Sequence, residues 1–294
     1  MKFIRAILFG AFLAFSCMNT NRPQPEPAEI AASVFPIADI TQNLIGDSLH
    51  VQAVIPPGAN PHTFDPQPAL IRSLQSARLF IGVNPEFDGW IVRYLPSSCQ
   101  AIFLENKAGD HEGHENPHIW LSVKSVRSFL PVIQQALVGG FPQHARAIEH
   151  NTGLYALQLD SVDTVLEKQF RHADKAFIQY HPAWDFLAKD YGLSILGTIS
   201  KGHGEAGSIK EFESLIRTAR EQNVHIIVAG LNEESPLIKA LAREIDGTIL
   251  RLNTLGDPKN PEIDAYLKLM TWNGKRLAAV LNDPVQPDHE QTGE

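Results

Sequence analysis

Short apolar runs alternate with longer amphipathic stretches along most of the chain, from Ile30 to Leu281. The apolar runs are rich in Val, Ile and Phe and end at Gly, Pro or polar residues, which is typical of buried strands. Strands are predicted at residues 29–35, 50–56, 78–83, 101–105, 175–181, 193–200, 224–230 and 248–253. Helices are predicted at residues 36–44, 66–77, 87–95, 182–191, 208–222, 235–245 and 261–281. This alternation predicts an α/β fold in which parallel sheets are flanked by helices.

The segment over residues 123–174 interrupts the alternation, because it contains no strand-like run. From Pro142 onward its apolar residues recur at helical spacing, which predicts one long linking helix over residues 142–173. A helix of roughly 30 residues extends about 45 Å, which is long enough to lie across two lobes. We therefore expect an N-terminal α/β lobe (29–141) and a C-terminal α/β lobe (174–282), joined by a rigid backbone helix and moving little against each other.

The first residues have the pattern of an export signal. Lys2 and Arg5 precede an apolar stretch of ten residues, which is too short to span a bilayer comfortably, and small residues follow. We predict that residues 1–16 are a signal peptide that is removed on export. The polar, proline-rich residues 17–28 are expected to form a disordered tether, and residues 283–294 a disordered tail.

Cys17 follows the expected cleavage point, as the acylated cysteine of a bacterial lipoprotein does. One departure is that Leu13 stands four residues before the cysteine, where the usual lipobox has Leu three residues before it. Acylation would hold the exported chain in the periplasm or at the outer face of the cytoplasmic membrane. The alternative is a secreted protein without lipid, in which Cys17 is free or paired with Cys99, the only other cysteine.

The overall charge argues against a nucleic-acid partner. The chain has a formal net charge of -8 and no run of Lys or Arg, whereas neutralising phosphates requires clustered cations. Its 44% hydrophobic and 20% charged residues are an ordinary globular composition, sufficient for a sizeable core.

Three histidines and one asparagine follow predicted strands, at the edge where open parallel sheets bind ligands. His62 and His118 come from the first lobe and His181 and Asn253 from the second, which places all four at a cleft between the lobes. Three neutral imidazoles around a fourth position suit Zn²⁺, whereas Mn²⁺ prefers more carboxylate oxygen. A proline adjoins each histidine and restricts the backbone, which lowers the cost of ordering the site. Taken singly, each histidine is more often a surface or hydrogen-bonded core residue than a ligand.

A second group of histidines precedes His118. Residues 110–115 read DHEGHE and contain His111 and His114 among acidic residues. Our hypothesis is that this loop captures zinc weakly and passes it inward to the fixed site. The alternative is a solvated loop without a role in transport.

Several segments in order along nearly the whole mature chain resemble the cluster A-I solute-binding proteins of bacterial zinc and manganese ABC importers, the ZnuA and TroA type. They include SVFPIADITQNLIG, VIPPGANPHTFDPQPALIRSLQSARLFIGV, NPHIWLSV, YHPAWDFLAKDYGL and EFESLIRTAREQNVHIIV. The resemblance implies two α/β lobes with metal held between them. It also implies a binding protein, not an enzyme, that delivers its metal to the membrane permease of an ABC importer. We expect a monomer.

The resemblance assigns the same site residues. The first two ligand histidines of the family, each in a Pro-His pair, correspond to His62 and His118. The third ligand corresponds to His181, where typical manganese members carry glutamate. Zn²⁺ is therefore expected as the transported ligand in preference to Mn²⁺. Members with a fourth protein ligand have aspartate where this chain has Asn253. The fourth metal position could therefore be filled by Asn253, by a carboxylate from elsewhere in the chain or by water, or it could stay empty.

One competing motif is the segment GHGEAG at residues 202–207, which matches the dinucleotide-binding fingerprint. The strand that follows it ends without the acidic residue that would bind a ribose hydroxyl. Ser208 and Glu211 predict a capping box for the next helix instead, with the glycines supplying the turn.

Catalytic zinc is also held by three histidines and a water, so a zinc-dependent hydrolase is an alternative. Asp65, Asp185 and Asp257 lie near the predicted ligands in sequence, but the chain has no HExxH motif. A binding protein for manganese or for a chelated metal is the other alternative.

Overall fold

A computed structural model of the chain describes residues 27–61, 63–104, 116–200 and 207–282. These residues form two four-stranded sheets in which all neighbouring strands are parallel. The first sheet has the order β2-β1-β3-β4, from β1 (Ile30–Val34), β2 (Val51–Ile55), β3 (Leu79–Gly82) and β4 (Gln100–Phe103). The second has the order β6-β5-β7-β8, from β5 (Phe177–Gln179), β6 (Ile195–Thr198), β7 (Ile226–Gly230) and β8 (Thr248–Leu252). All the predicted strands are confirmed, and the two sheets share one topology.

The central strands are buried on both faces, which explains their continuous apolar sequences. In the first sheet Ile30 of β1 pairs with Val51 on one side and Leu79 on the other, and every residue of β1 is buried. In the second sheet Phe177 of β5 pairs with Ile195 and Ile226. Such strands require helices on both sides of each sheet.

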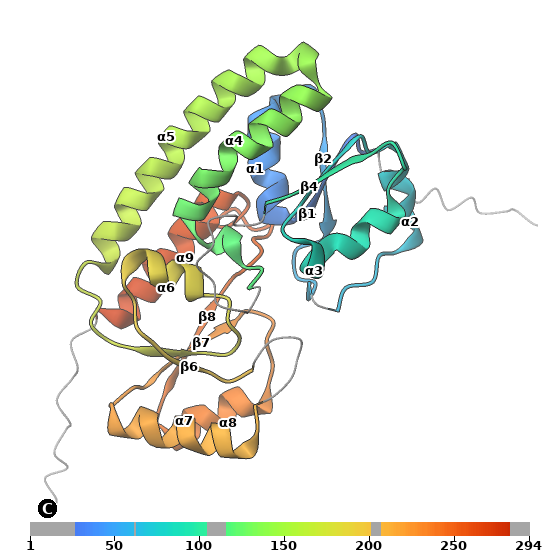
Figure 1. Cartoon of the computed structure of the whole chain (residues 1–294). Helices are drawn as coiled ribbons and strands as arrows, with labels where there is room; N and C mark the ends of the chain where they lie inside the picture. The colour runs from blue at the N-terminus through green and yellow to red at the C-terminus, as the bar shows by residue number, and fades with distance from the viewer. Residues whose placement is uncertain (1–26, 62, 105–115, 201–206, 283–294) are drawn as a thin grey trace, which may run out of the picture.

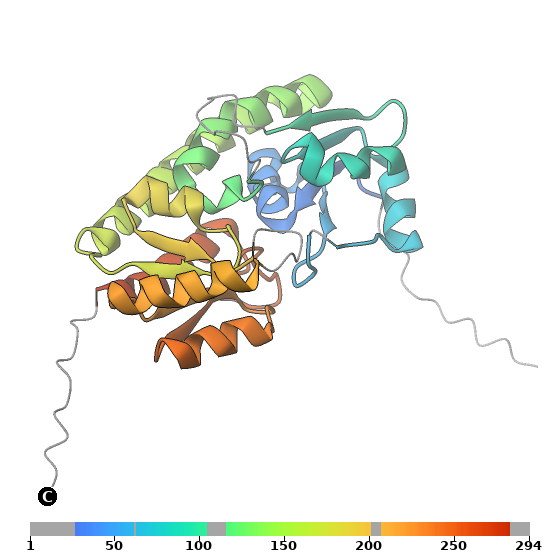
Figure 2. The same ribbon diagram turned by 60° about the horizontal axis from the view of Figure 1, so that its bottom comes forward.

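The helices divide between the lobes and the junction. The first lobe has α1 (Phe35–Ile45), α2 (Pro68–Ser73) and α3 (Pro85–Asp88), and the second has α6 (Asp185–Tyr191), α7 (Ile209–Glu221) and α8 (Pro236–Glu244). The junction has α4 (Val123–Gly140), α5 (Ala145–Phe170) and α9 (Tyr266–Leu281). Figures 1 and 2 show α7 and α8 covering the same face of the second sheet, and in Figure 1 this face is turned away from α5. Across the described ranges, no helix is long and apolar enough to cross a bilayer.

The linking helix is α5, whose 26 residues extend about 39 Å. A 3₁₀ turn at Pro142–His144 precedes it, so the segment predicted at 142–173 is helical over most of its length. α5 contacts α1 and α4 on the side of the first lobe and α6 and α9 on the side of the second (Figure 1). One rigid element therefore contacts both lobes, as the sequence predicts.

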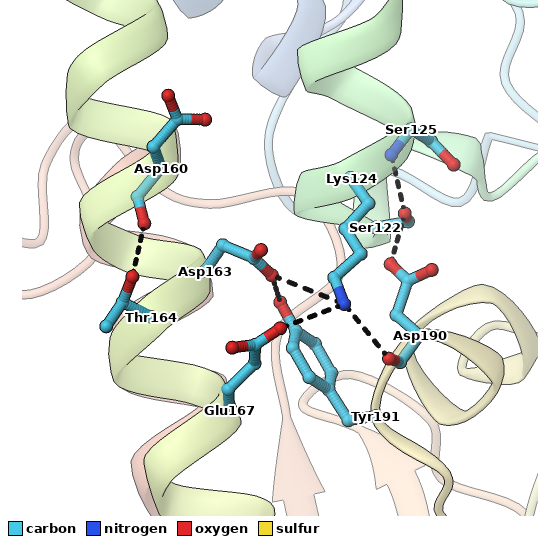
Figure 3. Close-up of polar contacts among 9 residues, drawn as sticks. All are labelled: Ser122, Lys124, Ser125, Asp160, Asp163, Thr164, Glu167, Asp190 and Tyr191. Atoms are coloured by element: carbon cyan, nitrogen blue, oxygen red, sulfur yellow. Dashed lines mark hydrogen bonds and ion pairs between the residues drawn. The ribbon is translucent and has the colours of Figure 1, made fainter.

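A lysine connects three helices at this junction (Figure 3). The Lys124 Nζ of α4 lies 3.2 Å from a Glu167 carboxylate oxygen and 4.0 Å from one of Asp163, both on α5. It also donates a hydrogen bond of 3.3 Å to the backbone carbonyl of Asp190 in α6. Because the lysine side chain is 41% exposed, we expect these ion pairs to stabilise the fold by well under about 1 kcal/mol each.

A less exposed hydrogen bond joins the same helices. The hydroxyl of Ser122, which caps α4, donates to the Asp190 carboxylate over 2.5 Å (Figure 3). Burial raises the pKa of Asp190, although the Ser122 hydroxyl and the Lys124 ammonium oppose the shift. Ser122 follows His118 closely in sequence, and α6 begins shortly after His181. The junction therefore fixes the two segments that carry predicted metal ligands.

The last helix begins at Tyr266 and not at Pro261, so the predicted start was wrong. Ala265 is extended, and the backbone N–H of Tyr266 donates to the Asp39 carboxylate of the first lobe over 2.8 Å. The preceding residues form a turn closed by a hydrogen bond from the Asp257 N–H to the Ile263 carbonyl, at 3.0 Å. A cap supplied by a residue so distant in sequence leaves no local signal.

The predicted capping box at the start of α7 is confirmed. The Ser208 hydroxyl accepts from the Glu211 N–H over 3.2 Å, and the Glu211 carboxylate accepts from the Ser208 N–H over 2.7 Å. Residues 201–206, which hold most of the glycine-rich motif, lie outside the described residues.

Candidate metal site

A pocket of about 810 Å³ lies between the lobes, at the carboxyl ends of both sheets. Three of the predicted site residues line it: His118 of the first lobe and His181 and Asn253 of the second. The fourth, His62, lies outside the described residues, as does the loop with His111 and His114. Within the described ranges, no group of three or more His, Cys, Asp or Glu side chains is placed to hold one metal ion.

The two imidazoles face each other across the lobe boundary. The ring centroids of His118 and His181 are 5.0 Å apart, with an angle of 59° between the ring planes. His118 is buried at 3% exposure, and the His181 side chain is 17% exposed. With Zn–N bonds of about 2.0 to 2.1 Å and tetrahedral angles, two imidazoles bound to one zinc ion have ring centres about 5 Å apart. The observed separation fits a shared ion.

Aromatic packing holds the segment around His118. Trp120 is fully buried, its ring lies 5.2 Å from the His118 ring, and its indole N–H donates to the Thr254 carbonyl of the second lobe over 2.7 Å. Trp184, which follows His181, is also buried. Trp120 therefore packs against one predicted ligand, and Trp184 is a buried residue three positions after another.

The orientation of His118 is set by Asn116. The Asn116 Oδ1 lies 2.8 Å from the His118 Nδ1 and also accepts from the His118 backbone N–H at 3.0 Å. The Asn116 Nδ2 donates to the Pro182 carbonyl, at 2.5 Å, and to the Asp185 carboxylate, at 3.0 Å. Because both of these partners can only accept, the amide cannot be turned round. Its oxygen must face His118, so the His118 Nδ1 carries the proton.

The orientation of His181 is set by Glu233, in the loop between β7 and α8. The His181 Nδ1 lies 2.5 Å from the Glu233 Oε1, and the Glu233 Oε2 accepts from the Gly230 N–H over 2.5 Å. Burial favours the neutral acid, but the hydrogen bonds from His181 and the Gly230 N–H and the charge of Arg251 hold the pKa of Glu233 below its usual value. An ionised carboxylate can only accept, so His181 also carries its proton on Nδ1.

Both rings thus have Nδ1–H turned to an oxygen atom, so the lone pair that could bind a metal is on Nε2 in each case. Outer oxygen partners of this kind are the usual means by which proteins orient histidine ligands. Sequence reasoning missed Asn116 and Glu233. A detectable signal existed, since Glu233 also follows a predicted strand at the carboxyl edge and Asn116 stands two residues before a predicted ligand.

Asn253 is placed at the pocket, but its side-chain oxygen is already bonded. The Asn253 Oδ1 accepts from the backbone N–H groups of Leu255, at 2.8 Å, and Gly256, at 2.7 Å. Its own backbone exchanges two hydrogen bonds with the side chain of Asn273 in α9. Because an amide oxygen has two lone pairs, metal binding through Oδ1 would displace one of these turn hydrogen bonds. Asn253 as a ligand remains a prediction.

Comparison with known proteins identifies the family. The model of the ZnuA family, described as zinc-uptake complex component A, periplasmic, matches residues 30–280. The zinc-binding lipoprotein AdcA of Streptococcus pneumoniae (strain ATCC BAA-255 / R6) is 24% identical over 303 residues, which cover 94% of this chain and 60% of AdcA. The manganese ABC transporter substrate-binding lipoprotein PsaA of Streptococcus pneumoniae is 23% identical, over 94% of this chain and 96% of PsaA.

The fold is likewise similar to a solved one. The Cd-bound periplasmic metal binding protein from candidatus liberibacter asiaticus superposes with a TM-score of 0.77, at 19% identity, over 86% of this chain and 98% of that chain. At this identity the likeness establishes the two-lobe fold alone. Together with the family match over residues 30–280, it confirms the resemblance noted in the sequence: the chain belongs to the ZnuA family of periplasmic zinc-uptake components.

Proposed function

We propose that this protein is the extracytoplasmic metal-binding component of an ABC-type importer and that it captures Zn²⁺ in the pocket between its lobes. The observation that carries the proposal is the 5.0 Å separation of the His118 and His181 rings, each with its Nδ1 hydrogen-bonded to an outer oxygen. This arrangement offers one Nε2 from each lobe to a single ion. The role is binding and release, without turnover.

His62 is proposed as the third ligand. Its neighbours Asn60 and Pro61 line the same pocket as His118 and His181, which supports this assignment. Water is proposed for the fourth position, because the Asn253 oxygen already accepts two backbone hydrogen bonds. Asn253 then forms part of the pocket wall.

Zinc is favoured over manganese because the proposed protein donors are nitrogen atoms. The choice needs a test, since AdcA is named for zinc and PsaA for manganese. Competition titrations with both metals should be run on the wild type, on His181→Ala, and on His150→Ala as a control at an exposed histidine of α5. We expect zinc to bind the wild type and His150→Ala equally, and His181→Ala to lose most of this affinity. Preference of the wild type for manganese would refute the assignment.

The proposed setting is the outside of the cytoplasmic membrane, with a lipid on Cys17 and an ABC permease as the partner. Support comes from the apolar segment before Cys17 and from relatives that are named lipoproteins. Mass spectrometry of the membrane-extracted protein should show a diacylated chain that begins at Cys17. A mature chain without added lipid mass would refute the anchor while leaving the metal site untouched.

A further inference from the structure

Glu233 is an acidic residue in direct contact with the proposed ligand His181. Its two carboxylate oxygens have different partners: Oε1 faces the His181 Nδ1, and Oε2 accepts from the Gly230 N–H at the end of β7. The carboxylate packs so closely on the backbone there that a Cβ at position 230 would lie 3.0 Å from the Glu233 Cδ. Glycine at this position therefore makes room for the contact.

Arg251 of β8 holds the loop that carries Glu233. The Arg251 Nη1 donates to the backbone carbonyls of Gly230, at 2.9 Å, and of Glu233, at 2.5 Å. The guanidinium thus bonds to the backbone on both sides of the turn, while its own strand pairs with β7. Glu233 is consequently fixed relative to the second sheet, and a side chain fixed in this way can orient the ring that it contacts.

We propose that Glu233 is a positioning residue for metal binding. It holds His181 in the tautomer and orientation that present Nε2 to the ion. It also supplies, through that hydrogen bond, a negative charge that the directly binding groups lack. The inference rests on the proposed function. The three proposed imidazoles, water and Asn253 are all uncharged, so without Glu233 none of these groups would offset the positive charge of a divalent ion. A carboxylate behind an imidazole raises the basicity of the ligand nitrogen.

The position of this charge bears on metal choice. A carboxylate bound directly to the ion would add an oxygen ligand, which suits manganese. A carboxylate behind His181 adds the charge while leaving nitrogen as the ligand, which suits zinc. The hydrogen-bonded pair of Glu233 and His181 would therefore help the site to select zinc. It would do so even though this chain has Asn253 where related proteins with four protein ligands carry aspartate.

The test substitutes Glu233→Gln. A carboxylate accepts hydrogen bonds at both oxygens, whereas an amide accepts at only one, so glutamine must abandon either the Gly230 N–H or the His181 Nδ1–H. Glu244→Gln is the control: it removes the same charge from an exposed side chain of α8, which is 53% exposed, pairs with Arg220 and does not line the pocket. Thermal unfolding of the metal-free proteins shows whether each variant is folded.

Zinc affinity should be measured by competition with a chromophoric chelator, and the tautomer of His181 by long-range proton–nitrogen NMR on metal-free protein at mildly alkaline pH. We expect Glu233→Gln to bind zinc about 10- to 100-fold more weakly than wild type and Glu244→Gln to stay within about twofold. In the wild type, His181 should be the Nδ1–H tautomer, and Glu233→Gln should reduce that population.

Two results would overturn the inference: wild-type zinc affinity in folded Glu233→Gln, or an Nε2–H tautomer of His181 in the wild type. The second needs no variant, so misfolding of Glu233→Gln cannot hide it. Failure of the wild type itself to bind zinc would refute the proposed function instead, so the two failures are distinguishable.

Discussion

The side-chain amide of Asn116, in the first lobe, donates a hydrogen bond of 3.0 Å to the carboxylate of Asp185, in the second. The same amide orients His118, and Asp185 is in turn held by the Gln179 side chain at 2.6 Å. Asn116 therefore links a proposed ligand of one lobe to a fixed acceptor of the other. The hydrogen bonds that orient His118 therefore also join the two lobes.

Replacing Asn116 with alanine should weaken zinc binding by about 10- to 100-fold, because His118 loses the acceptor that fixes its ring. Chelator competition is the measurement. Asn43→Ala serves as the control, since it removes an exposed amide hydrogen bond of α1 that does not touch the pocket. Equal zinc affinities of the two variants would show that Asn116 does not orient His118.

Asp39 gives a prediction for stability against pH. Burial raises the pKa of Asp39 to about 6, above the ordinary aspartate value of 3.8, although the Tyr266 N–H donates to it. Between pH 3.8 and about pH 6 the Asp39 carboxyl is more protonated in the folded chain than in the unfolded chain. The contribution of Asp39 to the free energy of unfolding therefore falls as pH rises through this range. Asp39→Asn, whose side-chain oxygen can still accept from Tyr266, should remove that contribution.

Denaturant unfolding of the metal-free wild type and of Asp39→Asn, from about pH 4 to pH 7, measures this effect. We expect the variant to gain stability relative to the wild type as pH rises, by on the order of 1 to 3 kcal/mol in total. A difference between the two proteins that stays constant with pH would show that Asp39 is not the group responsible.

The packing of α9 on α5 gives a prediction at two glycines. A Cβ at Gly274 of α9 would lie 2.1 Å from the Leu166 Cδ2 of α5, whereas a Cβ at Gly153 of α5 would have nothing within 4 Å. Gly274→Ala should therefore lower the free energy of unfolding by about 1 to 3 kcal/mol through overpacking. Gly153→Ala should raise it by about 0.5 to 1 kcal/mol through helix propensity. Thermal or denaturant unfolding measures both, and the same sign for both variants would contradict the packing described.

The sheets and the linking helix were predictable from the sequence because their signals are local. The apolar runs around β1 and β7 are continuous since both faces of these strands are buried. The Ser208 and Glu211 capping box likewise lies within one turn of chain. The start of α9 was not predictable, because its cap comes from Asp39 in the other lobe.

Part of the candidate site was predictable for a similar reason. Residues that follow parallel strands meet at one edge, so His118 and His181 were expected to converge, and their rings do. The outer partners depend on side-chain directions that periodicity does not carry. The position of Asn116 beside His118 is visible in the sequence, but its contacts with Pro182 and Asp185 across the lobes are not.

The central claim is that imidazoles from the two lobes bind one zinc ion through Nε2. Crystals of the zinc-loaded protein, measured at the zinc absorption edge, locate the ion directly. The account predicts one strong anomalous peak in the pocket, about 2.0 to 2.1 Å from the Nε2 atoms of His118 and His181. A peak elsewhere, or one bonded to Nδ1 of either ring, would contradict it.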